Sequence, residues 1–280
     1  MKVFRFWADH TEPGDDFPVK CWAASNQSLD DALRQAADRA RGVVSRLRAG
    51  DRSMASYEYG HVGLREEIVQ ELRDDTGSLI GAITRNRYGA LVLNSARTFF
   101  ADVDLPAPSA LDRAAGFLGR LLSKRPPPPE PQQQLVQRIR AAVDRTRGLG
   151  MRLYRTCAGF RVIVTTAEHD PASDESLALM NDLGSDSLYV RLCRSQQCFR
   201  ARLTPKPWRC GADRPPLQYP FPDSDSEAAY RRWEKGYDDQ VLPYATCAFI
   251  GTFGTDAVIP AVAPIVDIHD TWTVGEGRLA

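Results

Sequence analysis

The sequence has no net charge and no long hydrophobic run, and both absences limit its class. Its 36 Lys and Arg residues balance 36 Asp and Glu residues. The whole chain is therefore not attracted to nucleic acid or to a membrane surface, and such binding must come from a local patch. No apolar run approaches the roughly 20 residues of a membrane-spanning helix, and Met1 to Trp7 lack the apolar core of a signal peptide. We therefore expect a cytoplasmic protein with no membrane partner.

Several common motifs and metal patterns are also missing. The sequence contains no P-loop, no Rossmann glycine fingerprint and no Gly-x-Ser-x-Gly nucleophile motif. Its six cysteines are scattered, and a chain of 280 residues needs no disulfides to stabilise its core. We expect reduced thiols. Zinc at Cys193, Cys198 and Cys210 would need a fourth ligand, such as Cys157 or His169, and structural zinc sites use closer cysteine pairs. This spacing argues against zinc.

Hydrophobic periodicity predicts intermingled helices and strands. Helical spacing is present at about 28–48, 64–73, 111–122, 132–147, 173–183 and 226–237. Alternating or short apolar runs predict strands at about 1–7, 79–84, 90–93, 98–104, 151–156, 160–165, 244–253 and 264–268. Two pairs of these strands, 79–84 with 90–93 and 151–156 with 160–165, are predicted to form antiparallel hairpins. We therefore expect an α+β fold with a mixed, largely antiparallel sheet built from hairpins and covered by helices, with a mixed-sheet α/β fold as the alternative.

One proline-rich stretch interrupts this pattern. Four consecutive prolines at 126–129 cannot continue a helix and favour polyproline II. Because the strands on both sides resemble parts of one sheet, we expect a single globular domain over residues 1–280. The stretch at about 124–133 would be an exposed linker or insertion within it.

The most informative stretch is Phe99 to Leu105, in which two carboxylates lie one residue apart at the end of an apolar run. If this stretch is a strand, Asp102 and Asp104 project from the same face. Two like charges so close repel each other, and a hard divalent cation such as Mg²⁺ or Mn²⁺ would relieve that repulsion. The alternative is a strand that ends in a polar turn, with both carboxylates in water.

Basic residues are concentrated in two segments. Residues 132–166 hold seven arginines against one acid, and residues 187–212 hold six basic residues and no acid. Arginine binds phosphate through a planar, bidentate fork, and Trp208 offers a ring for stacking. We therefore favour phosphate or other anion binding; the alternative is that the arginines pair with acids elsewhere or are solvated. The candidate phosphate-binding residues are Arg155, Arg161, Arg200, Arg202, Lys206 and Arg209.

Acids combined with basic hairpins are what phosphoryl or nucleotidyl transfer requires, because carboxylate-bound metals neutralise the phosphates and activate the attacking oxygen. A third carboxylate usually completes such a site. Asp267 is the first candidate and Asp270 the second, and a solvated strand end is the alternative for both. His269 lies between these two acids in the sequence. It is either a general base oriented by an acid or an ordinary hydrogen-bonding residue.

Two short segments resemble the archaeo-eukaryotic primase superfamily, the primase-polymerases. These are Phe99 to Asp104, with its acid pair, and Tyr154-Arg155-Thr156-Cys157-Ala158-Gly159-Phe160-Arg161-Val162. The resemblance implies an RRM-like core in which Asp102 and Asp104 hold metals and Asp267 completes the set. Arg161 would stand where that family has a nucleotide-binding His. Arginine also binds phosphate, but this departure puts polymerase activity in doubt.

The leading hypothesis is a divalent-metal-dependent protein, with Mg²⁺ or Mn²⁺ at Asp102, Asp104 and Asp267, that binds a nucleotide or nucleic acid. Nucleotidyl transfer of the primase-polymerase type is its catalytic form. The alternative is a non-catalytic nucleic-acid-binding or regulatory protein in which the acid pair is structural.

Overall fold

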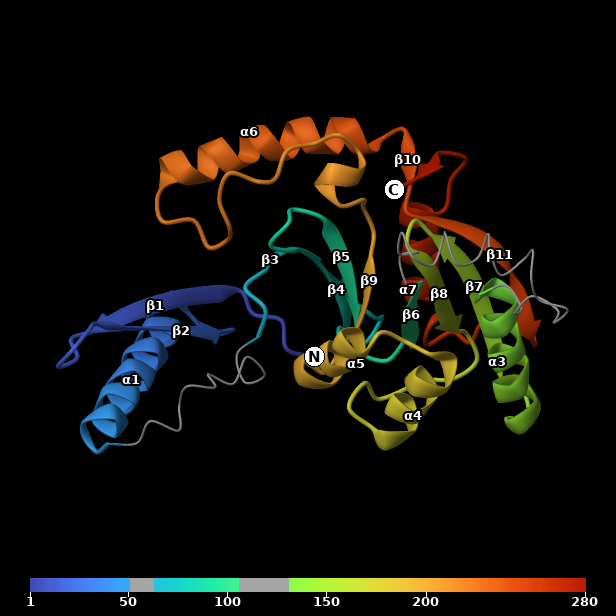
Figure 1. Ribbon diagram of the computed structural model, residues 1–280, viewed down its shortest axis with the longest axis horizontal. Coiled ribbons are helices and arrows are strands. Elements are labelled where there is room, and N and C mark those ends of the chain that lie inside the picture. Colours follow the sequence, from blue (N-terminus) through green and yellow to red (C-terminus); the bar gives the residue numbers. More distant parts are fainter. Residues whose placement is uncertain (51–62, 106–130) are drawn as a thin grey trace, which may run out of the picture.

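A computed structural model describes residues 1–50, 63–105 and 131–280 of the chain. Helices and antiparallel sheets are intermingled along these residues, which confirms the predicted α+β class (Figure 1). The helices are α1 (Leu29–Arg48), α3 (Pro131–Arg145), α4 (Asp174–Leu183), α5 (Ser187–Gln196), the 3₁₀ turn η2 (Pro207–Arg209), α6 (Ser224–Val241) and α7 (Ala263–Thr273). The strands are β1 (Phe6–Glu12), β2 (Val19–Ser25), β3 (Glu67–Arg73), β4 (Leu79–Arg85), β5 (Leu91–Ser95), β6 (Phe100–Asp104), β7 (Gly150–Thr156), β8 (Gly159–Val164), β9 (Phe199–Arg202), β10 (Tyr244–Ala245), β11 (Cys247–Gly254) and β12 (Arg278–Leu279).

Four antiparallel strands in the order β11-β7-β8-β6 form the sheet that carries the acid pair. The predicted hairpin at 151–165 is confirmed as β7 and β8, whose register pairs Met151 with Val164. Every residue of β8 is buried, as expected for a central strand whose apolar residues face covered layers on both sides. The sheet therefore holds Asp102 and Arg161 on rigid, paired strands.

A second antiparallel sheet has the order β3-β4-β5-β9 and includes the predicted hairpin at 79–93. Its strand β9 also lies beside β6, because the Tyr189 hydroxyl is 3.0 Å from the Phe100 carbonyl oxygen and 3.1 Å from that of Arg200. Among the described residues, the elements from β6 to β9 follow in the order β6, α3, β7, β8, α4, α5 and β9. The end of β9 and the basic residues after it thus lie near the end of β6.

The first 50 residues form a hairpin of β1 and β2 on which α1 packs, to one side of the sheets (Figure 1). The predicted helix start is confirmed: the Ser28 hydroxyl accepts a hydrogen bond from the Asp31 N–H and caps α1. Small and branched side chains face the hairpin and give this unit its own apolar cluster, made of Val19, Cys21, Ala40, Val43 and Val44.

The helix predicted at 64–73 is wrong, because residues 67–73 are strand β3, paired antiparallel with β4. Apolar residues at 64, 68 and 72 are four apart, and positions four apart share a face in a strand as well as in a helix. Pairing with β4 satisfies the backbone groups of this segment as a strand. Only Leu72 of β3 is buried.

The strand predicted at 264–268 is also wrong, because these residues lie in α7. The branched run Ile265-Val266 favours a strand locally, and Pro264 suits the first turn of a helix. Ile265, Val266 and His269 all pack inward, which is helical spacing. Tertiary packing thus overrides the local preference.

Some predictions lie outside the described residues, namely the helix at 111–122 and residues 124–130 of the proline-rich stretch. Residues 131–133 of that stretch form the first turn of α3 instead of linker. None of the helices in the described ranges is both long and apolar enough to cross a bilayer.

Candidate functional site

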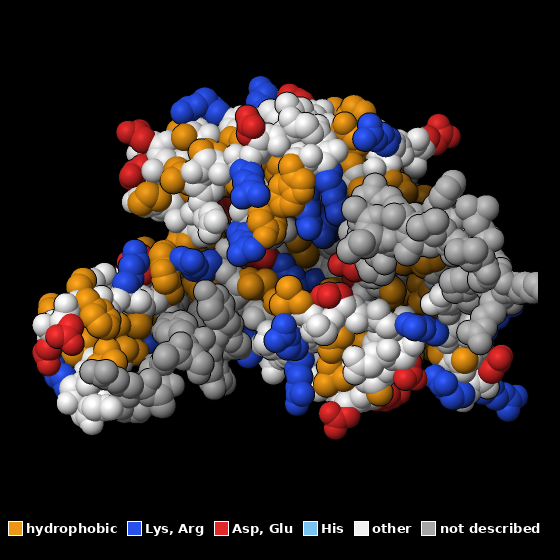
Figure 2. Space-filling view, viewed as in Figure 1, with side chains coloured by type: hydrophobic (Ala, Val, Ile, Leu, Met, Phe, Trp, Pro, Cys, Tyr) orange, Lys and Arg blue, Asp and Glu red, His pale blue; other side chains and the backbone are white. Residues whose placement is uncertain are grey.

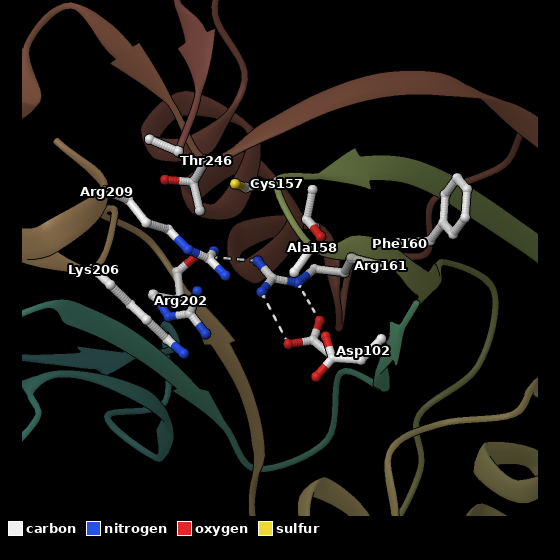
Figure 3. A pocket seen from close by; sticks show the side chains of 12 residues that line it. Asp102, Cys157, Ala158, Phe160, Arg161, Arg202, Lys206, Arg209 and Thr246 are labelled. Atoms are coloured by element: carbon white, nitrogen blue, oxygen red, sulfur yellow. Dashed lines mark hydrogen bonds and ion pairs between the residues drawn. The ribbon is translucent and has the colours of Figure 1, made fainter. Parts of the chain in front are cut away.

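Both predicted aspartates and four of the six predicted basic residues line one small pocket (Figure 3). The pocket lies where the end of β6, the turn between β7 and β8, and the segment after β9 meet. Its volume is about 60 Å³, which suits a phosphate-sized group rather than a whole nucleotide. Its lining is Asp102, Asp104, Thr156, Cys157, Ala158, Phe160, Arg161, Arg202, Lys206, Arg209, Thr246 and Ala280.

Asp102 and Arg161 form the central contact of the pocket. They lie directly opposite each other in the antiparallel register of β6 and β8. Arg161 Nε lies 2.8 Å from Asp102 Oδ1, and Nη2 lies 3.2 Å from Oδ2. Although burial of Arg161 disfavours its charge, Asp102 raises the pKa of Arg161 above its ordinary value. Both oxygens of Asp102 are therefore bonded to a permanent cation.

A glycine allows these two strands to approach closely. Gly159 lies opposite Asp104, and a Cβ there would collide with the Val103 carbonyl oxygen. The Thr156 hydroxyl accepts a hydrogen bond from the Gly159 N–H at 3.0 Å and closes the turn. The small residues between β7 and β8 are thus needed for the backbone geometry at the rim of the pocket.

Three further cations face this pair from the segment after β9. Arg202, Lys206 and Arg209 are half-buried, and none of them has a carboxylate partner among the ion pairs formed within the described residues. Burial lowers the pKa of Arg202, Asp102 opposes this shift, and the neighbouring Arg161 and Arg209 add to it. Burial, followed by Arg202 and Arg209, likewise lowers the pKa of Lys206. Such crowding of like charges favours a bound anion.

Asp104 lies at the rim, with an exposed side chain. Partial loss of hydration raises the pKa of Asp104, and the charges of Asp102 and Asp186 raise it further. Asp186 is the acid that sequence reasoning missed. It caps α5 through the Tyr189 N–H, and its own N–H donates to the Asp102 carbonyl oxygen at 3.2 Å. No pattern in the sequence placed Asp186 near Asp102.

Two predicted phosphate-binding residues lie elsewhere. The Arg200 guanidinium is buried against Glu66, with Nη2 at 2.7 and 2.8 Å from the two carboxylate oxygens. Its Nη1 donates to Asn94 Oδ1 at 2.6 Å. Arg155 lies over the Phe160 ring, 4.6 Å from its centroid, and does not line the pocket.

Asp267, the predicted third acid, is exposed on α7 and does not line the pocket. Asp270, the second candidate, accepts hydrogen bonds from Arg152 Nη1 and His269 Nδ1, both at 2.8 Å. The helical form of this segment, which sequence reasoning took for a strand, puts Asp267 on the solvent side and His269 on the buried side. The two acids therefore do not complete a set with Asp102 and Asp104.

The donor set does not fit a divalent metal as it is arranged. Asp102 has both oxygens bonded to Arg161, and Asp267 is not in the pocket. Within residues 1–50, 63–105 and 131–280, no group of three or more His, Cys, Asp or Glu side chains is placed to hold a metal ion. Mg²⁺ or Mn²⁺ at this site stays a prediction.

Comparison with known protein families, curated proteins and solved structures found no match. The resemblance to the primase-polymerases therefore stays a hypothesis.

Proposed function

We propose that this protein binds the phosphate groups of a nucleotide or nucleic acid in the pocket between β6, β8 and η2. The observation that supports this proposal is the convergence of Arg202, Lys206 and Arg209 on one small pocket, without carboxylate partners among the described residues. Arg161 and these three residues bring four positive charges against the two negative charges of Asp102 and Asp104. A phosphate would be attracted by this excess and would accept their hydrogen bonds.

An aromatic ring next to the pocket favours a ligand that carries a base. Trp208 is 45% exposed and lies between Lys206 and Arg209 in the sequence. Lys206 Nζ lies 5.5 Å and Arg214 Cζ 5.4 Å from its ring centroid, and the Tyr88 ring packs edge-on at 5.2 Å. A rigid, exposed indole of this kind can stack a base while the adjacent cations hold phosphates. Figure 2 shows Lys and Arg side chains gathered around hydrophobic side chains in the middle of this face.

The binding test uses fluorescently labelled single-stranded oligonucleotides and nucleoside triphosphates, measured by anisotropy over a range of salt concentrations. The double variant Lys206→Gln/Arg209→Gln should weaken binding at least tenfold and reduce its salt dependence by about two phosphate contacts. The matched control is Arg191→Gln/Arg194→Gln, which removes two exposed charges of α5 outside the pocket. Equal losses in both double variants would reject the pocket as the binding site.

Nucleotidyl transfer of the primase-polymerase type is the second candidate. The observation that favours it is the position of Asp102 and Asp104 beside the basic side chains of the pocket, and a metal there would require Asp102 to leave Arg161. Its test is incubation with radiolabelled nucleoside triphosphates, a single-stranded template and Mn²⁺. Product that disappears in Asp102→Asn/Asp104→Asn would support transfer, and no product from the wild type would reject it.

A further inference from the structure

Arg161 is almost completely buried, although it lines a pocket. Its side chain is 2% exposed, and it is the largest of the fully buried side chains in the described residues. A guanidinium has five N–H groups, and four of these have acceptors. Nε and Nη2 donate to Asp102, and Nη1 donates to the Arg202 carbonyl oxygen at 3.1 Å and to His269 Nε2 at 3.3 Å. Figure 3 shows the guanidinium directed at the carboxylate of Asp102.

A second layer of contacts holds the guanidinium in this place. His269 is buried, and its Nδ1 lies 2.8 Å from Asp270 Oδ1. The ionised Asp270 fixes the Nδ1–H tautomer, so Nε2 has a free lone pair that accepts from Arg161. Asp270 is itself bonded to Arg152. A network of side-chain contacts thus runs through the protein to the pocket, in the order Arg152, Asp270, His269, Arg161 and Asp102. A cation–carboxylate pair lies on each side of the neutral His269 imidazole.

We infer that Arg161 is a built-in cation that takes the part of a divalent metal at Asp102, so that the pocket binds phosphate without Mg²⁺ or Mn²⁺. The ligand class rests on the function proposed above, whereas the Arg161 contact with Asp102 rests on the structure alone. A metal could coordinate Asp102 only after the carboxylate left Arg161. The guanidinium would then stay buried without a counter-charge, which weakens metal binding by roughly 100-fold or more. His269 is a positioning residue in this scheme.

The test titrates Mn²⁺ alone into the full chain and follows free Mn²⁺ by electron paramagnetic resonance. The wild type should bind no Mn²⁺ below millimolar concentration at a site that depends on Asp102. Arg161→Gln leaves Asp102 and Asp104 without the guanidinium, so this variant should gain a Mn²⁺ site about 100-fold tighter than any in the wild type. Adding Asp102→Asn to Arg161→Gln should remove it. Arg161→Lys, which keeps a cation, should behave like the wild type.

Submicromolar to micromolar Mn²⁺ binding by the wild type that is lost in Asp102→Asn would overturn the inference, as would a folded Arg161→Gln variant with no gained site. If Arg161→Gln does not fold, His269→Ala is the second variant. This variant removes one acceptor of the Arg161 guanidinium and should give a smaller gain in Mn²⁺ affinity. His269→Gln should reverse that gain, because its amide oxygen can accept from Nη1. No gain in folded His269→Ala would then count against the inference.

A parallel measurement separates this inference from the proposed function. Binding of a labelled nucleoside triphosphate to the wild type is compared in EDTA and in Mn²⁺. Equal affinity supports the inference, and binding only with Mn²⁺ overturns it. No binding in either condition rejects the proposed phosphate ligand, and the Mn²⁺ titration of the variants still decides the part played by Arg161.

Discussion

Arg161 and Asp102 face each other across β8 and β6, and the guanidinium donates two hydrogen bonds to the carboxylate. One partner is buried and the other is 25% exposed. The pair therefore neutralises a charge that would otherwise be buried alone, and the excess of Arg202, Lys206 and Arg209 over Asp104 makes the pocket positive. Variants of this pair and of its neighbours can separate its contribution to stability from its contribution to binding.

Asp102→Asn should lower the free energy of unfolding by about 2–4 kcal/mol, because it leaves the Arg161 charge buried and uncompensated. The measurement is urea unfolding, read from the midpoint at constant slope. The matched control is Asp182→Asn, which removes the exposed partner of Arg145 and should change stability by less than about 0.5 kcal/mol. Similar losses in both variants would contradict a structural role for the Asp102 pair.

His269 should make stability depend on pH in a defined window. Burial, opposed by the hydrogen bond to Asp270, lowers the pKa of His269 from 6.5 to about 4. The folded state therefore favours the neutral imidazole, and its contribution is fully present above pH 6.5 and is lost as the pH falls towards 4. This contribution is about 3 kcal/mol. The groups facing the imidazole are Asp270, Arg161, Cys247, Thr273 and the rings of Tyr154 and Phe100.

The check is the difference in unfolding free energy between wild type and His269→Gln at pH values from 4 to 8. The difference should grow in favour of the wild type as the pH rises from 4 to 6.5 and then stay constant. A difference that does not vary with pH would show that His269 titrates normally in the folded protein.

Two arginines on β9 should separate stability from binding. Arg200→Gln should lower the free energy of unfolding by about 3–5 kcal/mol, because Glu66 is then buried without its partner. It should leave oligonucleotide affinity unchanged in the folded fraction. Arg202→Gln should instead keep its stability and bind the oligonucleotide more weakly, with a salt dependence reduced by about one phosphate contact. If Arg200→Gln lost affinity and Arg202→Gln did not, the ligand would be placed at Arg200 and not at Arg202.

Asp104→Asn should strengthen oligonucleotide binding roughly threefold at pH 7, because it removes a negative charge that faces the phosphate. The same logic predicts that wild-type affinity rises as the pH falls, since the raised pKa of Asp104 brings its protonation to higher pH. Anisotropy titrations from pH 4.5 to 7.5 measure both effects. Weaker binding in Asp104→Asn would instead indicate that the carboxylate holds a metal used by the ligand.

Gly159→Ala should lower the free energy of unfolding by about 1–3 kcal/mol, because the added Cβ collides with the Val103 carbonyl oxygen and separates β8 from β6. Gly236→Ala is the control within α6, where no atom lies within 4 Å of the added Cβ. It should stabilise the protein by about 0.5–1 kcal/mol. Thermal unfolding of both variants measures the contrast, and equal effects would refute the close approach of the two strands.

Local sequence determined the α+β class, the capped helices at 29–48 and 174–183, and both hairpins, because turn residues, N-caps and strong periodicity act within a few residues. It also indicated that Asp102, Asp104, Arg161, Arg202, Lys206 and Arg209 belong together. Tertiary structure decided the rest. Cross-strand register paired Asp102 with Arg161, and the buried Glu66 formed an ion pair with Arg200. Packing made 263–273 a helix, which directs Asp267 to solvent and His269 inward. These outcomes depend on which distant backbone or charge lies opposite each side chain, and no local pattern encodes that.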